Sequence, residues 1–312
     1  AHHLIVDAIS MRTLVREFEK TYAGLLRGST KEISFPKCRY LEWVEFHADR
    51  ARTLDMPDRW LFWERQLRGC ADPAENIRDH TDLHGVKICE AATEVDLSHC
   101  EKIDEPASTA ILAQLNTSRL RHDAILAAVL RNAAPILRKE ELVVRLRHHG
   151  RFTYGDNPTA ATVGWLTHHF PLALKASEHM PLRDIMAEAA VKLGDVPDYG
   201  ISFGWLHYLL PDRDTSSTLK NGKSCDVFFS FLDDVRIGAG ISGRFRILET
   251  VVRHQYSNQS FYPEPLIVHS EVHDKCIQIT IRANGHFAED DIRDLARKIS
   301  NDLRDVAQLG GS

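Results

Sequence analysis

Histidine is the residue type in this sequence that stands out as able to do acid–base chemistry. The 312-residue chain contains 17 histidines, and six of them form the adjacent pairs His2-His3, His148-His149 and His168-His169. Imidazole has an unperturbed pKa close to neutral pH, so it can take up and release protons under physiological conditions. The pairs are therefore the first candidates for a catalytic site.

The pair His2-His3 precedes an aspartate, Asp7, which lies directly before a helical pattern. Neighbouring side chains on extended backbone point in opposite directions, so one imidazole can face a cavity while the other is held by its surroundings. The carboxylate can fix such a loop through charge-assisted hydrogen bonds. The alternative interpretation is an exposed pair near a terminus, or the remnant of a tag.

The other histidines have simpler interpretations. His148-His149 follows a predicted strand and is typical of a surface or capping position, although it can also line a cleft. His168-His169 lies in a segment interpreted as a loop packed against the core. His269 and His273 lack the spacing of a helical metal pair, and the sequence has no H-E-x-x-H motif, so no metal site is expected.

Composition and charge restrict the function classes. The chain is 43% apolar and 27% charged, which is typical of a globular protein, and its 39 basic and 44 acidic residues give a net charge of −5. A mildly acidic chain predicts neither nucleic-acid nor membrane-surface binding. The six cysteines form no C-x-x-C pair, and the sequence has neither an 18-residue apolar stretch nor a signal peptide. We expect reduced thiols and a cytoplasmic location.

The hydrophobic periodicity predicts a mixture of helices and strands. Steps of three and four over residues 11–25 indicate an amphipathic helix, with Ser10 as its N-cap and Gly28 at its end. Further helices are expected at 40–51, 60–67, 108–115, 121–137, 182–193, 201–210 and 288–308, and strands at 86–89, 92–97, 142–146, 172–174, 227–232, 266–270 and 277–281. The polar stretch 71–85 is the best candidate for a linker. This order favours an α/β or α+β protein of about two structural units.

Several segments together resemble the condensation and epimerisation domains of nonribosomal peptide synthetases. His2-His3-x-x-x-Asp7-Ala8 is similar to their H-H-x-x-x-D-G motif, and later segments follow in the family's order. These are 121–128, the H-G-R match His149-Gly150-Arg151, the T-V-G-W-F-T match Thr162-Val163-Gly164-Trp165-Leu166-Thr167 with Phe170-Pro171, the segment 197–204, and 228–232. The resemblance covers nearly the whole chain.

The resemblance implies a chloramphenicol acetyltransferase-like α/β fold of two α+β sandwich lobes, with the histidine motif in the cleft between them. Residues 1–80 then correspond to the C-terminal part of the N-terminal lobe, and 81–312 to the complete C-terminal lobe. The sequence begins at Ala1, directly before the motif and without an initiating methionine. We therefore expect a fragment of a longer protein.

The resemblance also implies residue roles. In the family the first motif histidine is largely positional and the second is catalytic, so His2 is expected to support and His3 to catalyse. The motif aspartate pairs with an arginine of the C-terminal lobe, which implies an ion pair between Asp7 and Arg151. The role of His3 stays open between a general base and a group that orients the attacking amine.

Two further residues, His149 and Trp165, are candidates for lining the cleft. The family binds no cofactor of its own. Its substrates arrive on the phosphopantetheine arms of carrier proteins, which implies carrier domains and adjacent synthetase modules as partners.

The sequence departs from the family pattern at two positions. Ala8 replaces the motif glycine, which costs stability if φ there is positive. Arg147 replaces the glutamate with which epimerisation domains move the Cα proton, and a guanidinium stays protonated and cannot act as that base. We therefore expect amide-bond formation. The alternatives are epimerisation of a carrier-bound peptidyl thioester and a catalytically silent domain that recruits partner proteins.

Overall fold

The computed structural model describes residues 5–28, 36–54, 56–68, 97–154, 157–210, 225–233, 264–273, 275–283 and 287–308. The α-helices are α1 (Ala8–Leu26), α2 (Tyr40–Thr53), α3 (Pro57–Leu67), α5 (Glu105–Gln114), α6 (Ser118–Leu137), α7 (Leu182–Gly194), α8 (Ile201–Gly204) and α10 (Glu289–Gln308). The strands are β1 (Leu97–Lys102), β2 (Glu141–His148), β3 (Thr153–Tyr154), β4 (Asn157–Pro158), β5 (His168–Lys175), β6 (Val227–Leu232), β7 (Leu266–His273) and β8 (Cys276–Ala283). A 3₁₀ turn, η2 (Pro197–Gly200), precedes α8, and a π-helical turn, η3 (Trp205–Leu209), follows it.

A six-stranded mixed sheet, with the strand order β1-β8-β7-β6-β2-β5, forms the centre of the molecule. β6 pairs in parallel with both β2 and β7, and the other neighbouring strands are antiparallel. Buried and partly exposed residues alternate along most of β7 and β8, as expected for strands with one face on a core. The register places the end of β2 beside the start of β5, with His148 opposite His168.

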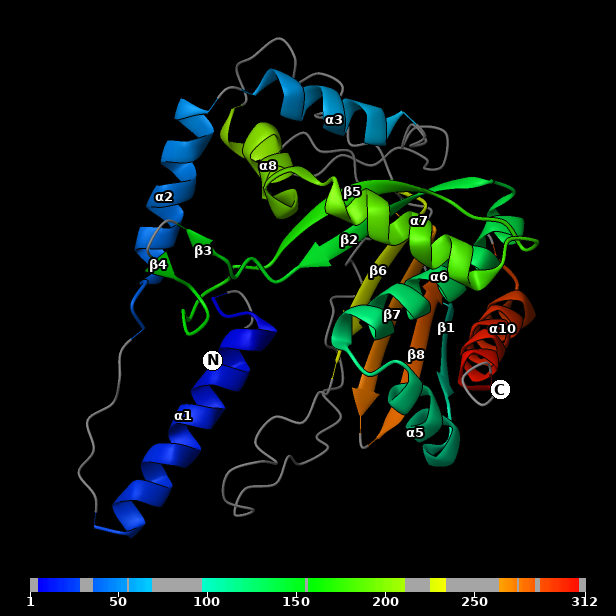
Figure 1. Cartoon of the computed structure of the whole chain (residues 1–312), viewed down its shortest axis with the longest axis horizontal. Helices are drawn as coiled ribbons and strands as arrows, with labels where there is room; N and C mark the ends of the chain where they lie inside the picture. The colour runs from blue at the N-terminus through cyan, green and yellow to red at the C-terminus, as the bar shows by residue number, and fades with distance from the viewer. Residues whose placement is uncertain are drawn as a thin grey trace.

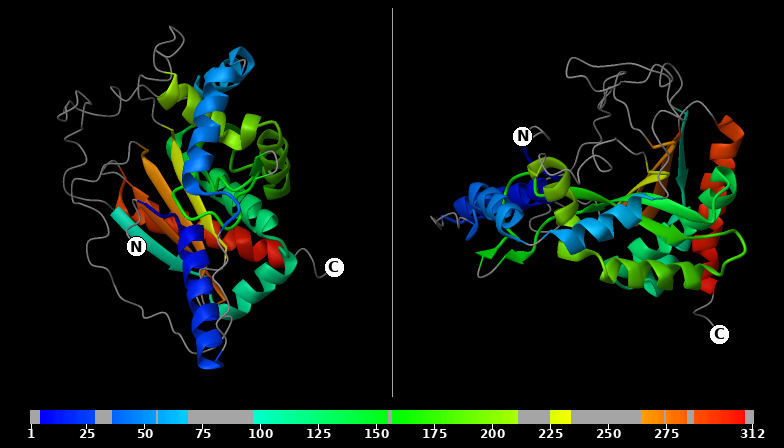
Figure 2. Two further views of the ribbon diagram at one scale, coloured as in Figure 1. Left: turned by 90° about the vertical axis from the view of Figure 1, so that its left-hand side faces the viewer. Right: turned by 90° about the horizontal axis from the view of Figure 1, so that it is seen from above.

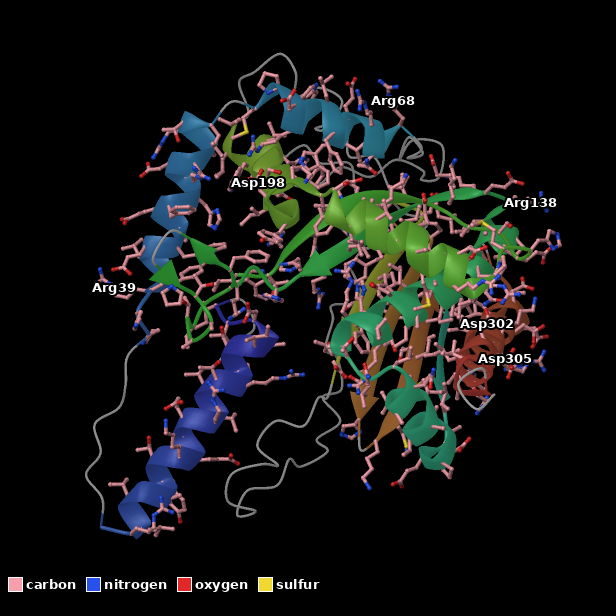
Figure 3. The ribbon with its side chains drawn as sticks, viewed as in Figure 1. Arg39, Arg68, Arg138, Asp198, Asp302 and Asp305 are labelled. Atoms are coloured by element: carbon pink, nitrogen blue, oxygen red, sulfur yellow. The ribbon has the colours of Figure 1, made fainter. Side chains whose placement is uncertain are left out.

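Helices α5, α6, α7 and α10 cover one face of this sheet (Figures 1 and 2). Their apolar side chains and those of the strands form one core, in which Leu130, Val144 and Leu295 have no exposed surface. Asp302 on α10 accepts hydrogen bonds from Arg131 and Asn132 on α6, at 3.1 and 2.7 Å, and so joins the two longest helices of this layer (Figure 3). The core fixes the end of β2 and the first turns of α6 relative to one another.

A second group of helices, α2, α3 and α8, lies at the β5 edge of the sheet (Figure 1). Trp63 of α3 is fully buried there, with its ring 5.9 Å from that of Phe170 and 5.4 Å from that of Phe203. Its Nε1–H donates to the buried hydroxyl of Ser202 at 3.1 Å. The indole therefore connects α3 to β5 and α8 through both packing and a hydrogen bond.

The predicted periodicities agree with most described elements, and one predicted cap is wrong. The strand predicted at 227–232 has those bounds in the structure, and most other described helices and strands differ from their predictions only at the ends. β1 shares a single residue with the predicted strand 92–97, and no prediction covers β3 and β4. Helix α1 is capped by Asp7, whose carboxylate accepts from the Ser10 N–H, and not by Ser10. The His168-His169 pair lies at the start of β5 and not in a loop, because it pairs with the end of β2.

Some predictions lie outside the described residues. These are the linker 71–85, the strand 86–89 and all but the last residue of 92–97. Of the described cysteines, Cys38, Cys225 and Cys276 are buried, and all four including Cys100 are thiols. Within the described parts of the chain, no helix is both long and apolar enough to cross a membrane.

We expect Trp63→Phe to lower the free energy of unfolding by about 1–3 kcal/mol, because it removes the indole N–H from a buried hydroxyl and leaves a small void. Urea unfolding followed by circular dichroism measures the change. Trp60→Phe, at a half-buried position on the same helix, is the matched control and should cost less. Equal losses for the two variants would contradict the role given to the Trp63 hydrogen bond.

Candidate active site

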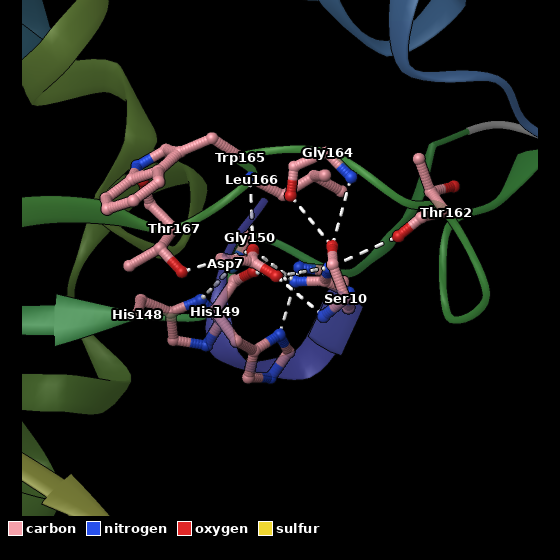
Figure 4. Close-up of polar contacts among 11 residues, drawn as sticks. Asp7, Ser10, His148, His149, Gly150, Thr162, Gly164, Trp165, Leu166 and Thr167 are labelled. Carbon is pink, nitrogen blue, oxygen red and sulfur yellow. Dashed lines mark hydrogen bonds and ion pairs between the residues drawn. The ribbon is translucent and has the colours of Figure 1, made fainter. Parts of the chain in front are cut away.

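An ion pair between Asp7 and Arg151 is the centre of the candidate site (Figure 4). Arg151 Nη1 donates to Asp7 Oδ2 and Nη2 donates to Asp7 Oδ1, both at 2.7 Å. The side chains are 5% and 2% exposed, so the pair is almost completely removed from water. A two-pronged contact of this kind fixes the relative orientation of both groups. It joins the N-terminus of α1 to the loop that follows β2.

The carboxylate of Asp7 has further donors around it. Its Oδ1 accepts from the Ser10 N–H at 2.8 Å, and its Oδ2 accepts from the Leu166 N–H at 3.1 Å and the Thr167 hydroxyl at 3.3 Å. Burial by itself would raise the pKa of Asp7, but the hydrogen bonds and charge of Arg151 and the Ser10 N–H outweigh it and lower the pKa to about 2. The group is therefore a carboxylate at neutral pH and serves as an anchor, not as an acid.

Ser10 connects the ion pair to the segment before β5. Its hydroxyl donates to the Gly164 carbonyl at 2.8 Å and accepts from the Gly164 N–H at 3.0 Å and from Arg151 Nη2 at 2.8 Å. These three bonds use the one donor and both acceptor positions of a hydroxyl. Ser10 is completely buried, so the first turn of α1 is held against 162–167 without an unsatisfied polar group.

Gly150 explains how Arg151 reaches this position. Gly150 has φ of +66°, and a Cβ there would lie 1.9 Å from the backbone oxygen of Leu166. Only glycine allows both the left-handed conformation and this close approach of two backbones. The glycine of the H-G-R match therefore brings the loop after β2 against the Leu166 segment and points Arg151 at Asp7.

The two imidazoles before Gly150 have the same tautomer. The Gly150 N–H donates to His148 Nδ1 at 3.1 Å, and the Arg151 N–H donates to His149 Nδ1 at 2.9 Å. A backbone N–H can only donate, so each Nδ1 is an acceptor and the proton of each neutral ring is on Nε2. Both rings are therefore hydrogen-bond donors at Nε2.

Burial keeps these rings neutral. It lowers the pKa of His148 to about 2, with the charges of His149, His168 and His122 acting in the same direction. Burial and the nearby Arg151 charge also lower the pKa of His149, which Asp7 partly opposes. His148 is stacked on Phe152 at 4.5 Å. Neither ring is set up to carry a positive charge near neutral pH.

A cavity of about 560 Å³ lies beside the ion pair. Its wall includes Asp7, His122, Arg147, His148, His149 and Trp165, from α1, α6, the end of β2 and the segment before β5. A cavity of this volume is large enough for a small-molecule substrate. The wall presents imidazoles and guanidinium groups beside aromatic side chains, which suits a polar reacting group on an apolar chain.

The structure brings together the predicted residues that it describes. Asp7 and Arg151 form the ion pair, and His149 and Trp165 line the cavity; the Trp165 Nε1–H donates to the Thr167 carbonyl at 2.9 Å. His2 and His3 lie outside the described residues. Ala8 is the first residue of α1 and is not among the described residues with positive φ, so the loss of the motif glycine carries no backbone strain.

Sequence reasoning missed the roles of three polar contributors. Ser10 is predicted as a helix cap, although it bridges Arg151 and Gly164, and Thr167 is predicted only as the last residue of the T-V-G-W-F-T match, although its hydroxyl donates to Asp7. His122 belongs to a segment that carries only the family resemblance, although it lines the cavity. The adjacent His122-Asp123 pair in an otherwise apolar helical run is the signal that could have identified it.

The ion pair predicts strong coupling between Asp7→Asn and Arg151→Gln. Each single variant leaves one buried group without its partner and should lower the free energy of unfolding by about 3–5 kcal/mol. The double variant should lose much less than the sum, because neither charge remains. Urea unfolding of the four proteins measures the coupling. Additive losses would show that the two side chains do not stabilise one another.

Buried and half-buried histidines predict a loss of stability in acid. Burial lowers the pKa of His47 and His269 to about 4, of His169 to about 3 and of His148 to about 2. The unfolded chain takes up these protons first, so their contribution is complete above about pH 6.5 and falls as the pH drops. Each group accounts for up to about 1.4 kcal/mol per pH unit. Melting temperatures from pH 7 to 4.5 test this.

The matched variants for the acid experiment are His269→Leu and His179→Gln. The first removes a half-buried imidazole and should flatten the pH dependence. The second changes a side chain that is 88% exposed and should leave the dependence unchanged. A melting temperature that does not vary between pH 7 and 4.5 would be inconsistent with neutral buried imidazoles.

Comparisons with known proteins identify the family. A family model described as "Condensation domain" matches residues 1–310. The chain is 27% identical over 241 residues to bacitracin synthase 3 of Bacillus licheniformis, covering 75% of this chain and 4% of that protein. It is 26% identical over 219 residues to tyrocidine synthase 1 of Brevibacillus parabrevis, covering 68% of this chain and 19% of that protein. The chain thus spans a small part of the curated relatives it matches.

Solved structures share the fold. The epimerization domain from the third module of tyrocidine synthetase B matches with a TM-score of 0.73 at 18% identity, over 98% of this chain and 68% of that chain. The first condensation domain of the CDA synthetase matches with a TM-score of 0.61 at 12% identity, over 98% and 62%. The chain belongs to the condensation domain family, which confirms the resemblance and the chloramphenicol acetyltransferase-like α/β fold predicted from its motifs.

Proposed function

We propose that this chain carries the condensation site of a nonribosomal peptide synthetase, where an amide bond forms between carrier-tethered aminoacyl or peptidyl thioesters. The observation that carries the proposal is the buried Asp7–Arg151 pair beside a cavity lined by imidazoles. The pair fixes the first turn of α1, and the histidine motif directly precedes that turn in the sequence. His3 is the proposed catalytic group and His2 its support.

The proposed reaction needs positioning more than reactive side chains. Both substrates are thioesters on phosphopantetheine arms, so the docking of two carrier domains replaces a bimolecular encounter by a local one. His3 then accepts a proton from the amine or orients it. The cavity supplies the space in which the two arms meet. Carrier domains and adjacent modules of the synthetase are the proposed partners.

Arg147 favours condensation over epimerisation. Its side chain lies on the cavity wall, and its Nε donates to His169 Nε2 at 3.3 Å. Epimerisation needs a base that removes the Cα proton, and a guanidinium cannot accept one. The guanidinium carbon also lies 5.5 Å from the centre of the Phe228 ring, which holds the arginine in place.

The test uses the full-length parent protein with donor and acceptor carrier domains loaded with aminoacyl thioesters. We expect wild type to form the amide, and His3→Ala to lose about 10²–10⁴-fold in rate. His179→Gln, a histidine at the exposed surface, should retain full activity. Equal product from wild type and His3→Ala would overturn the assignment of His3.

Two other outcomes separate the alternatives. Loss of α-deuterium from a labelled peptidyl thioester, without amide formation, would identify an epimerase. No turnover with any substrate, together with carrier binding that Asp7→Asn leaves unchanged, would identify a silent domain that recruits partners. Retention of the label in an amide product supports condensation.

A further inference from the structure

His122 lines the same cavity from helix α6, far along the chain from the histidine motif. It lies in the second turn of α6 and lines the cavity with His148 and His149. The centre of its ring lies 5.4 Å from that of Phe229 of β6 in an edge-to-face arrangement, so aromatic packing fixes the plane of the imidazole. The side chain is 25% exposed and therefore reachable from the cavity.

A buried carboxylate orients the His122 ring. Asp123 Oδ1 lies 2.9 Å from His122 Nδ1, and Asp123 Oδ2 accepts from Arg119 Nε at 2.6 Å. The side chain of Asp123 is 6% exposed. Burial would raise the pKa of Asp123, but the hydrogen bonds from His122 and Arg119 outweigh it and lower the pKa, so the group is ionised. An ionised carboxylate only accepts hydrogen bonds, so His122 Nδ1 carries the proton.

The tautomer of His122 is thus opposite to that of its neighbours. With the proton on Nδ1, the Nε2 of a neutral His122 carries the lone pair and can accept a proton. His148 and His149 have their protons on Nε2 and their lone pairs occupied by backbone N–H groups. Of the three described imidazoles on the cavity wall, His122 is the one whose second nitrogen can act as a base.

The charges around His122 leave Asp123 as the carboxylate that acts on it. The other charged or titratable groups on the cavity wall are Arg12, Arg119, Arg147, His148, His149, Asp7 and Asp233. Asp7 is paired with Arg151, and Asp233 is paired with Arg121 at 3.0 Å. The Arg12 guanidinium donates to the Asp233 carbonyl at 3.1 Å. Of these carboxylates, Asp123 is therefore the one that contacts the His122 ring, and it does so at Nδ1.

We propose that His122 is a second catalytic base in this cleft, whose Nε2 removes the first proton from the α-ammonium group of the acceptor substrate. The inference rests on the proposed condensation function. The α-ammonium loses two protons when the C–N bond forms and the C–S bond breaks. One passes from the ammonium to His122 Nε2 and then to water. The other is lost from nitrogen after attack and protonates the departing thiolate, which becomes the free thiol of the donor arm.

A purely structural role for His122 would be to satisfy buried Asp123. The two roles differ in their pH dependence, because an α-amino group has an unperturbed pKa of about 8 and needs no base above it. We expect His122→Gln to lower kcat by about 10²-fold at pH 6.5 with little change in the acceptor KM. At pH 9 the loss should shrink to a few-fold. A loss that is the same at both pH values, or no loss at all, would overturn the proposal.

Asp123→Asn is a matched variant that keeps the ring and reverses its tautomer. Arg119 donates to one oxygen of Asp123, so an asparagine there should turn its oxygen to Arg119 and its NH₂ to His122 Nδ1. The imidazole would then carry its proton on Nε2 and lose its base character. We expect the same pH-dependent loss of kcat as in His122→Gln. Full activity of a folded Asp123→Asn enzyme would contradict the tautomer mechanism.

Nitrogen-15 NMR of histidine-labelled wild-type protein tests the tautomers without any turnover. The His122 signals, assigned from their loss in His122→Gln, should show a protonated Nδ1 and an unprotonated Nε2, and His148 and His149 the reverse. A proton on His122 Nε2 would refute the proposal even in an active enzyme. The two failures are distinguishable: a wild type that forms no amide overturns the proposed condensation function, whereas a wild type that forms the amide with the proton on His122 Nε2 overturns the base assignment alone.

Discussion

The arrangement of the whole site depends on one buried ion pair, Asp7 with Arg151. Removing a carboxylate and a guanidinium from water costs several kcal/mol per ion, and their attraction compensates only with good geometry and additional hydrogen bonds. Here the carboxylate receives the two guanidinium nitrogens, two backbone N–H groups and a hydroxyl. Because such a network tolerates few alternative geometries, it specifies one position for the first turn of α1.

The position of α1 in turn determines which side chains face the cavity. Asp7 is both the N-cap of α1 and the partner of Arg151, so the anion lies at the positive end of the helix dipole. Ser10, one turn later, binds Gly164 and Arg151 and prevents the helix from rotating about its axis. Arg12 therefore points at the end of β6, where it donates to the Asp233 carbonyl. Helix α1, the loop after β2 and the end of β6 thus surround one cavity.

Sequence patterns predicted the elements of this fold better than the contacts between them. The apolar run Val227–Leu232 and the alternating side chains of β7 and β8 indicate which residues are buried, and this information is contained in the residue types themselves. The choice of Asp7 over Ser10 as cap depends on Gly164, more than 150 residues away, which occupies the Ser10 hydroxyl. Periodicity contains no information about such long-range partners. The Asp7–Arg151 pair was expected only through resemblance, and the role of His122 depends on a contact of its Nδ1 with Asp123 that the hydrophobic periodicity does not report.

The tautomer of each imidazole in this site is set by the group that binds its Nδ1, a backbone N–H group for His148 and His149 and a carboxylate for His122. His148 and His149 receive backbone N–H groups at Nδ1 because the left-handed Gly150 turns the chain back onto them. His122 meets a carboxylate instead, because Asp123 follows it on a helix whose next residues are all buried. Since formation of an amide requires groups that give hydrogen bonds and groups that take protons, one cavity with imidazoles of both kinds can serve both needs. The replacement of a glutamate by Arg147 removes a base from the end of β2 but leaves the one on α6 in place.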